Sequence, residues 1–284
     1  YATNPRYQGG GSSHITAFKV TNALESARKI VPNISYAKGC EDETDEIDEK
    51  LLQDAVELAK VVDVAVCFVG LPDSFESEGY DRKHIHLPKC QNKLVFEVSR
   101  VNPNTVVVLH NGSPVDMPWL KQVKSVLEAY LGGQAVGEVT ADILYGIVNP
   151  SGHLAETFPR QLEDNPSTID FGGHQDTVEY REGIYVGYRY YDLKKMKVLF
   201  PFGHGLSYTA FSYSNLKFDK DNFKDSETIN VHVDVTNIGG VEGKIVIQLY
   251  VSDKTGYEYQ PQKELRAYKK INLKPGETKT VDIE

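Results

Sequence analysis

Hydrophobic and polar positions follow one pattern before residue 150 and another after it. In residues 46–60, EIDEKLLQDAVELAK, leucine and alanine recur at helical spacing opposite an acidic face, which predicts an amphipathic helix. The next apolar stretch, DVAVCFVG (63–70), is uninterrupted, as expected for a strand that is covered on both faces of a parallel sheet. The chain is therefore predicted to pass from a surface helix into a buried strand.

The same alternation then repeats. Further helices are expected over Lys89 to Val101 and over AVGEVTADILYG (135–146), and strands over TVVVLHNG (105–112) and, more briefly, SVLEAYLGG (125–133). Strands rich in β-branched residues that alternate with helices predict an α/β fold. The expected architecture is an α/β/α sandwich with a mostly parallel, doubly wound sheet.

After Pro150 the pattern changes. Residues 150–210 are rich in proline, glycine and aromatic residues without a clear period, and we interpret them as an ordered connecting segment. From Phe211 onward, short strands alternate apolar and polar positions between Gly/Pro turns: INVHVDVTN (229–237), KIVIQLYVSD (244–253), ELRAYKKINL (264–273) and ETKTVDIE (277–284). This spacing predicts an antiparallel β-sandwich of the fibronectin III or immunoglobulin kind.

The expected domain organisation is therefore an α/β sandwich domain over residues 1–160, a connecting segment over 161–210, and a fibronectin III-like domain over 211–284. A chain of 284 residues is long enough to form two domains of different fold class.

Composition narrows the possible partners. The formal net charge is -9, and the sequence has no stripe of basic residues that could bind nucleic acid or an anionic membrane surface. Neither is therefore expected as a partner. No apolar run approaches the roughly 20 residues of a membrane span. The three cysteines are widely spaced and odd in number, which favours reduced thiols in a cytoplasmic protein, with Cys67 in a strand core. No metal site and no cofactor are predicted.

An acidic loop follows the first buried strand directly. The stretch LPDSFESEGYDR (71–82) carries four carboxylates, Asp73, Glu76, Glu78 and Asp81. Ligands of open α/β sheets bind outside the carboxyl ends of the strands. Neighbouring carboxylates raise the pKa of at least one member of the group, which is what a general acid requires. A solvated surface loop is the alternative interpretation.

A second candidate loop, YQGGGSSH (7–14), is rich in glycine and hydroxyl groups. Its glycines would let a ligand approach the backbone, and Ser12 or Ser13 could donate a hydrogen bond to a phosphate or a sugar hydroxyl. A flexible surface turn explains the same composition. From these residues alone the chemistry stays open between a hydrolase that uses carboxylates and a binding module.

Longer motifs are more specific. Six segments occur in the order that they take in glycoside hydrolase family 3, the β-glucosidase family, which the chain resembles over nearly its whole length: PRYQGGGSSHI, ESEGYDRKHIHLPKCQNKLV, VVVLHNGSPVDMPWL, LGGQAVGEVTADILYGIVNPSGHLAETFP, EGIYVGYRYYD and FPFGHGLSYTAF. The tail KELRAYKKINLKPGETKTVDI resembles the fibronectin III-like domain that follows in that family.

The resemblance implies a retaining β-glycosidase that acts on a β-linked glucoside or oligosaccharide. Its nucleophile would be an aspartate on a TIM-type barrel, and its acid/base a glutamate on the α/β sandwich. The family's glutamate lies in a Glu-Ser-Glu-Gly context before Tyr-Asp-Arg, which corresponds to Glu78 here, with Glu76 as the alternative. Retaining chemistry needs no metal, and its two carboxyls stand about 5–5.5 Å apart.

The resemblance also suggests roles for residues near that glutamate. Ser12 corresponds best to a family serine that reaches a sugar hydroxyl in the -1 subsite, and Ser13 is the alternative. Phe75 is a candidate for stacking on a sugar in an aglycone subsite, or else a buried loop anchor. Asp81 and Arg82 are expected to form an ion pair or hydrogen bonds that anchor the loop.

Other conspicuous residues are assigned to structure. Trp119 is expected in the core, at the start of a helix. His204 and the tyrosines of GYRYYD are expected to tie the connecting segment onto the sandwich.

The sequence also departs from the family pattern. It has no eight βα repeats, and Asp followed by Trp, as in the family's nucleophile segment, does not occur. Both ends are expected to lie within domains, so we expect this chain alone to be an inactive portion that works with a barrel domain or chain carrying the nucleophile. A non-catalytic carbohydrate-binding or assembly module is the alternative function, and a phosphate-binding protein that uses the glycine-rich loop, with Arg6 as its cation, is a third.

Overall fold

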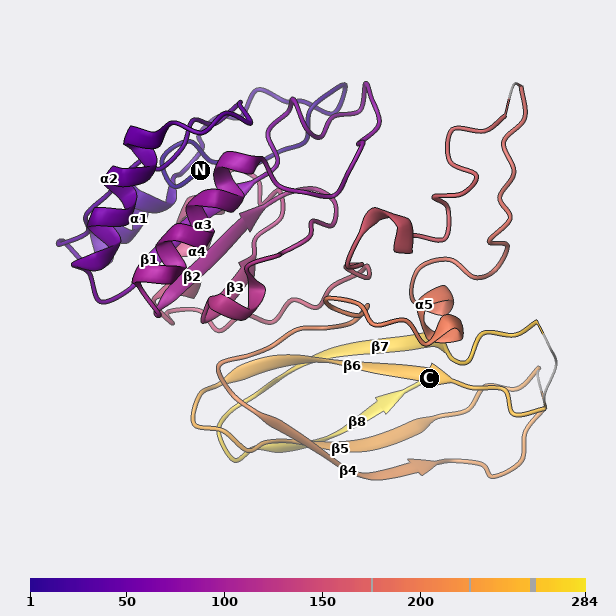
Figure 1. The fold of residues 1–284 in the computed structure, drawn as a ribbon. Coiled ribbons are helices and arrows are strands. Elements are labelled where there is room, and N and C mark those ends of the chain that lie inside the picture. Colours follow the sequence, from indigo (N-terminus) through magenta and orange to yellow (C-terminus); the bar gives the residue numbers. More distant parts are fainter. Residues whose placement is uncertain (175, 225, 256–258) are drawn as a thin grey trace. The chain divides into compact units, whose positions relative to one another are not determined.

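Two compact units make up the chain, residues 1–147 and residues 148–284, and a computed structural model describes residues 1–174, 176–224, 226–255 and 259–284. Figure 1 shows helices around a parallel sheet in the first unit and two antiparallel sheets in the second. This confirms the predicted α/β fold followed by an antiparallel β-sandwich. The finer domain limits at residues 160 and 210 stay a prediction.

The first unit is built on a three-stranded sheet in the order β1-β2-β3, with both pairs parallel. Its elements are α1 (Ala23–Ile30), α2 (Glu49–Lys60), β1 (Ala65–Gly70), α3 (Lys89–Val101), β2 (Thr105–His110), the 3-10 helix η1 (Leu120–Gln122), β3 (Ser125–Glu128) and α4 (Val136–Leu144). Strand β3 is shorter than predicted because the chain turns at Tyr130, whose φ is 49° and whose N–H donates to the Glu128 carboxylate.

Side-chain caps explain where helices α1 and α2 begin. Asp48 caps α2 by accepting hydrogen bonds from the N–H groups of Lys50 and Leu51, which places the helix start three residues later than predicted. Helix α1 was not predicted. Its signal is local, because Asn22 accepts from the N–H of Glu25 and the pair has the spacing of a capping box.

The core of the first unit is aliphatic. Val69, Val107, Val108 and Leu109 of the sheet are fully buried, and α3 packs against β1 and β2. Trp119 is completely buried at the start of η1, and its indole N–H donates to the side chain of Asn92 at 2.9 Å. The prediction of a core tryptophan is therefore confirmed.

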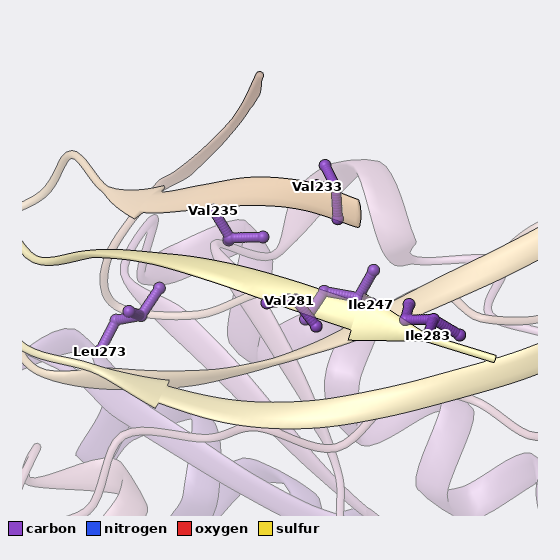
Figure 2. Packing of buried hydrophobic residues seen from close by; sticks show 6 residues of the cluster. All are labelled: Val233, Val235, Ile247, Leu273, Val281 and Ile283. Atoms are coloured by element: carbon purple, nitrogen blue, oxygen red, sulfur yellow. The ribbon is translucent and has the colours of Figure 1, made fainter. Parts of the chain in front are cut away.

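The second unit carries the sandwich. Its elements are η2 (Leu162–Asp164), α5 (Tyr188–Lys194), β4 (Phe211–Phe218), β5 (Val231–Asn237), β6 (Gly243–Val251), β7 (Glu264–Leu273) and β8 (Thr278–Ile283). One sheet has the order β4-β5-β8 and the other pairs β6 with β7, all antiparallel. Side chains from both sheets meet in one core of six residues (Figure 2): Val233, Val235, Ile247, Leu273, Val281 and Ile283.

Strict alternation produces that core. In β5 the odd-numbered residues Val231, Val233 and Val235 are buried, while the residues between them are only partly buried, as the period of a strand requires. The connecting segment is held to this sandwich by Tyr188 of α5, whose hydroxyl accepts the N–H of Leu265 at 2.8 Å. That contact confirms the expected role of a GYRYYD tyrosine.

No helix in the described part of the chain has both the length and the apolar content that crossing a lipid bilayer requires.

Candidate active site

Two neighbouring strands of the parallel sheet, β1 and β2, end side by side. Gly70, the last residue of β1, pairs with His110, the last residue of β2. A Cβ atom on Gly70 would lie 2.0 Å from the carbonyl oxygen of His110, so no larger residue fits there. The loops that leave these strands, residues 71–88 and 111–119, therefore begin at the same edge of the sheet, where ligands of such sheets bind.

The buried side chain of Arg6 anchors the acidic loop. Its side chain is 6% exposed and donates to the carbonyl oxygens of Leu71 and Glu76, the latter at 2.8 Å. The same guanidinium lies 3.4 Å from the carboxylate of Asp73 and 3.5 Å from that of Glu76. One buried cation thus fixes both the main chain and two carboxylates of this loop.

The carboxylate of Glu76 joins the two loops. It accepts the backbone N–H of Gly112 at 2.8 Å and the hydroxyl of Ser113, in addition to its ion pair with Arg6. Only 16% of the Glu76 side chain is exposed. Its oxygens are therefore occupied by internal donors, as in a structural carboxylate.

The carboxylate of Glu78 is exposed and differently held. It accepts the backbone N–H of Ser12 at 2.6 Å and the Ser12 hydroxyl at 2.5 Å, and its own N–H donates to the carbonyl of Gly10 at 3.4 Å. Gly11 makes this approach possible, because its φ is 104° and a Cβ there would lie 2.5 Å from the Cβ of Glu78. The hydrogen bonds from Ser12 lower the pKa of Glu78 below its usual value.

The two glutamates therefore differ in what they can do. Glu76 stabilises the loop, whereas Glu78 is positioned on one side by Ser12 and presents its carboxylate to solvent. Of the two carboxylates, Glu78 is the one that an incoming ligand could reach.

The other predicted site residues lie around this pair. Ser13 is exposed in the Gly11–His14 turn, beside Ser12. Phe75 is half-buried, and its ring meets that of His84 edge-on at 6.1 Å between centroids. Arg82 makes the expected anchoring bonds, since it donates to the Ser113 hydroxyl and to the carbonyl of Pro114, both at 2.8 Å.

Three partners of the acidic loop were not assigned to this site from the sequence. Gly112 and Ser113 donate hydrogen bonds to Glu76, and Arg6 forms an ion pair with the same carboxylate. Gly112 and Ser113 could have been found from topology. They lie in the segment NGSP, which follows a strand that neighbours β1 and therefore starts at the same edge of the sheet as the acidic loop.

Comparison with protein-family models finds two matches. Residues 1–208 match the model of the glycosyl hydrolase family 3 C-terminal domain, and residues 245–284 match the fibronectin type III-like domain.

Named relatives cover the whole chain. It is 53% identical over 284 residues to thermostable beta-glucosidase B of Acetivibrio thermocellus, a match that covers 99% of this chain and 38% of the relative. It is 40% identical over 285 residues to an exo-alpha-(1->6)-L-arabinopyranosidase of Bifidobacterium longum, covering 100% of this chain and 37% of that protein. The chain thus spans well under half the length of these relatives.

Solved structures share the fold. The crystal structure of the Bifidobacterium adolescentis GH3 beta-glucosidase superposes with a TM-score of 0.94 at 40% identity, over 99% of this chain and 41% of that one. Beta-glucosidase 3B of Thermotoga neapolitana in complex with glucose gives a TM-score of 0.83 at 32% identity, over 98% of this chain and 43% of that one.

Proposed function

Because the chain belongs to glycosyl hydrolase family 3, we propose that it forms the acid/base-bearing portion of a retaining β-glycosidase that removes terminal β-D-glucosyl residues. In this proposal Glu78 is the acid/base. The nucleophilic aspartate lies on a TIM-type barrel domain that is not among these 284 residues.

One observation carries the assignment of Glu78. Its carboxylate is exposed at the ligand-binding edge of the sheet and is held there by two donors of Ser12, while the neighbouring carboxylate of Glu76 is engaged by internal partners. A group that transfers protons to a substrate must be fixed in position yet accessible.

The proposed mechanism assigns Glu78 two roles. As a carboxylic acid it protonates the glycosidic oxygen while the nucleophile attacks the anomeric carbon and the bond to the leaving group breaks. As a carboxylate it then removes a proton from the water that hydrolyses the glycosyl-enzyme intermediate.

Other groups of the complete site would have to raise the pKa of Glu78 for it to act as an acid. In this chain Ser12 lowers the pKa of Glu78 and so favours the carboxylate. A nucleophilic carboxylate about 5–5.5 Å away, together with exclusion of water by the bound sugar, would raise that pKa again. Acid strength would therefore be tuned by the barrel and the substrate.

The proposed substrate class rests on the relatives. Thermostable beta-glucosidase B of Acetivibrio thermocellus is named for β-glucosides, and the Thermotoga structure contains glucose. The Bifidobacterium arabinopyranosidase matches this chain equally completely, so the choice of sugar would depend on residues outside the chain.

The test is a chimera in which this chain replaces the matching part of the Acetivibrio relative. Glu78→Gln should lower kcat/KM by about 10²–10⁴-fold on cellobiose, whose leaving group needs protonation, and far less on 2,4-dinitrophenyl β-glucoside, for which the slow step becomes hydrolysis of the glycosyl-enzyme. Azide should restore turnover of the activated substrate by giving β-glucosyl azide. Normal cellobiose hydrolysis by Glu78→Gln would overturn the assignment.

Glu76→Gln is the matched control. If Glu76 only stabilises the loop, its substitution should affect both substrates by the same factor, without rescue by azide. Leaving-group dependence and azide rescue confined to Glu76 variants would transfer the acid/base role to that residue.

The alternative function, a non-catalytic carbohydrate-binding module, is tested with the 284-residue chain alone. It requires calorimetric binding of cellobiose that survives Glu78→Gln.

A further inference from the structure

Away from the acidic loop, an irregular segment lies along the start of helix α3. Residues 31–48 contain neither helix nor strand. Helix α3 begins at Lys89 after Pro88, whose side chain provides no capping hydrogen bond. The irregular segment supplies a partner for the first N–H of that helix, the one of Lys89.

Several contacts fix the segment to α3. Asp45 accepts the backbone N–H of Lys89 at 2.5 Å, and its other carboxylate oxygen lies 2.9 Å from the Lys89 ammonium group. The thiol of Cys90 donates to the carbonyl of Thr44 at 3.3 Å. One helical turn further, the main chain at Gly39 packs on the side chain of Leu94, with a Cβ position only 2.8 Å from Leu94 Cδ2.

Cys40 and Cys90 meet between these contacts. Their thiols interact electrostatically, and the contacts of Gly39 with Leu94 and of Thr44 with Cys90 place the two residues beside each other. Cys90 is 3% exposed and Cys40 is half-buried. To form a disulfide, the two sulfur atoms would approach each other to roughly 2.05 Å.

The surroundings also favour reaction at Cys90. The interaction with Cys40 lowers the pKa of the Cys90 thiol, which lies in the first turn of a 13-residue helix. Helix N-termini stabilise thiolates, and the thiolate is the reactive form of cysteine. The same interaction and burial raise the pKa of Cys40, so the two sulfurs are unequal.

We propose that Cys40 and Cys90 are a modification site, at which oxidation by a peroxide closes an intramolecular disulfide between segment 31–48 and helix α3. The inference rests on the contacts of this unit alone and does not depend on the proposed glycosidase activity.

The reaction balances with the peroxide as the two-electron oxidant. The Cys90 thiolate attacks one peroxide oxygen, the O–O bond breaks, and a sulfenic acid and one water form. The Cys40 sulfur then attacks the Cys90 sulfur, the S–O bond breaks, an S–S bond forms and a second water leaves. Two thiols and one hydrogen peroxide thus give one disulfide and two waters.

Cys67 provides an internal comparison. It is buried within β1, and burial alone raises the pKa of its thiol to about 12. Cys67 and Cys90 are both buried, so the difference lies in protonation: a neutral thiol does not attack peroxide, whereas a thiolate does. Cys67 should therefore stay reduced under conditions that join the other two cysteines.

The test counts free thiols by mass spectrometry. The folded chain is treated with hydrogen peroxide, denatured without reductant and alkylated with N-ethylmaleimide. The number of alkylated cysteines should fall from three to one, return to three after dithiothreitol, and peptide mapping should join the peptides of Cys40 and Cys90. Three alkylated cysteines after peroxide, or a cross-link to Cys67, would overturn the proposal.

Variants provide the controls. Cys67→Ser should still form the cross-link and leave no alkylated cysteine, whereas Cys40→Ser and Cys90→Ser should form none. A disulfide between two chains, seen as a dimer on non-reducing gels, would contradict an intramolecular bond. Because the wild-type chain by itself gives the decisive count, the proposal can be tested even where a serine variant fails to fold.

Discussion

Ser12 donates both its backbone N–H and its hydroxyl to one carboxylate oxygen of Glu78, across 66 residues of sequence. Both bonds favour the ionised carboxylate, which is why the pKa of Glu78 lies below its usual value. The two hydrogen bonds hold the charged side chain of Glu78 in place, and the pKa of Glu78 can be used to measure their effect.

Ser12→Ala should raise the pKa of Glu78 toward its usual value, because the stronger of the two donors is lost and only the backbone N–H is left. The shift can be followed by ¹³C NMR of the Glu78 side-chain carboxyl during a pH titration. Ser13→Ala is the matched control and should leave the titration unchanged. An equal shift in both variants would mean that the loop, and not the hydroxyl of Ser12, sets the pKa.

Glu76→Ala should destabilise the first unit by about 2 kcal/mol, because it removes hydrogen bonds to a charged group and leaves Arg6 with one fewer counter-charge. Trp119 is the only tryptophan in the sequence and is buried in this unit, so its fluorescence during urea unfolding reports the change. Glu78→Ala, at the exposed position, should change the free energy of unfolding much less than Glu76→Ala does. Equal effects of both variants would refute a special role for Glu76.

Gly11→Ala should displace the Glu78 loop, because the new Cβ would lie 2.5 Å from the Cβ of Glu78 on a backbone with φ of 104°. We expect a loss of about 1–3 kcal/mol in the free energy of unfolding, together with a raised pKa of Glu78. Gly79→Ala is the control, since a Cβ there meets nothing within 4 Å. Amide hydrogen exchange of residues 72–82 would show whether the loop has moved; unchanged protection in Gly11→Ala would argue against the prediction.

His110 should make the first unit sensitive to acid. Burial lowers its pKa from 6.5 to about 4, so the folded state holds it neutral where the unfolded chain would bind a proton. Its contribution to stability is complete above pH 6.5 and is lost as the pH falls toward 4, a change of about 3 kcal/mol. Urea unfolding of His110→Phe, followed through Trp119, should show a flatter dependence on pH over this window. A slope equal to that of the wild-type chain would exclude His110 as its source.

Sequence periodicity was sufficient for most of the fold. Strand β7 spans Glu264–Leu273, as predicted, and the buried strand before the acidic loop ends at Gly70 in both the prediction and the structure. Helix α1 was missed because eight residues provide little periodicity, although its Asn22 cap is visible in the sequence. Helix α5 lies in a segment whose aromatic content hides any period.

The position of the acidic loop in the fold was predictable, whereas its internal arrangement was not. Position after a buried strand located the acidic loop correctly at the carboxyl edge of the sheet. The distinct surroundings of Glu76 and Glu78 could not be read from the sequence, because they depend on donors 36 and 66 residues away. Which of the two carboxylates serves as the acid/base stays a prediction that the chimera would test.

The distances along the chain between these partners have a consequence for folding. Arg6 reaches Glu76 across 70 residues, and Glu76 reaches Gly112 across 36, so the loop cannot take its final shape until β1 and β2 have paired. Contacts with such large sequence separation carry a high loop-closure cost and tend to form late. In refolding followed by pulsed hydrogen exchange, protection of the Ser12 and Gly112 amides should therefore lag behind that of the strands.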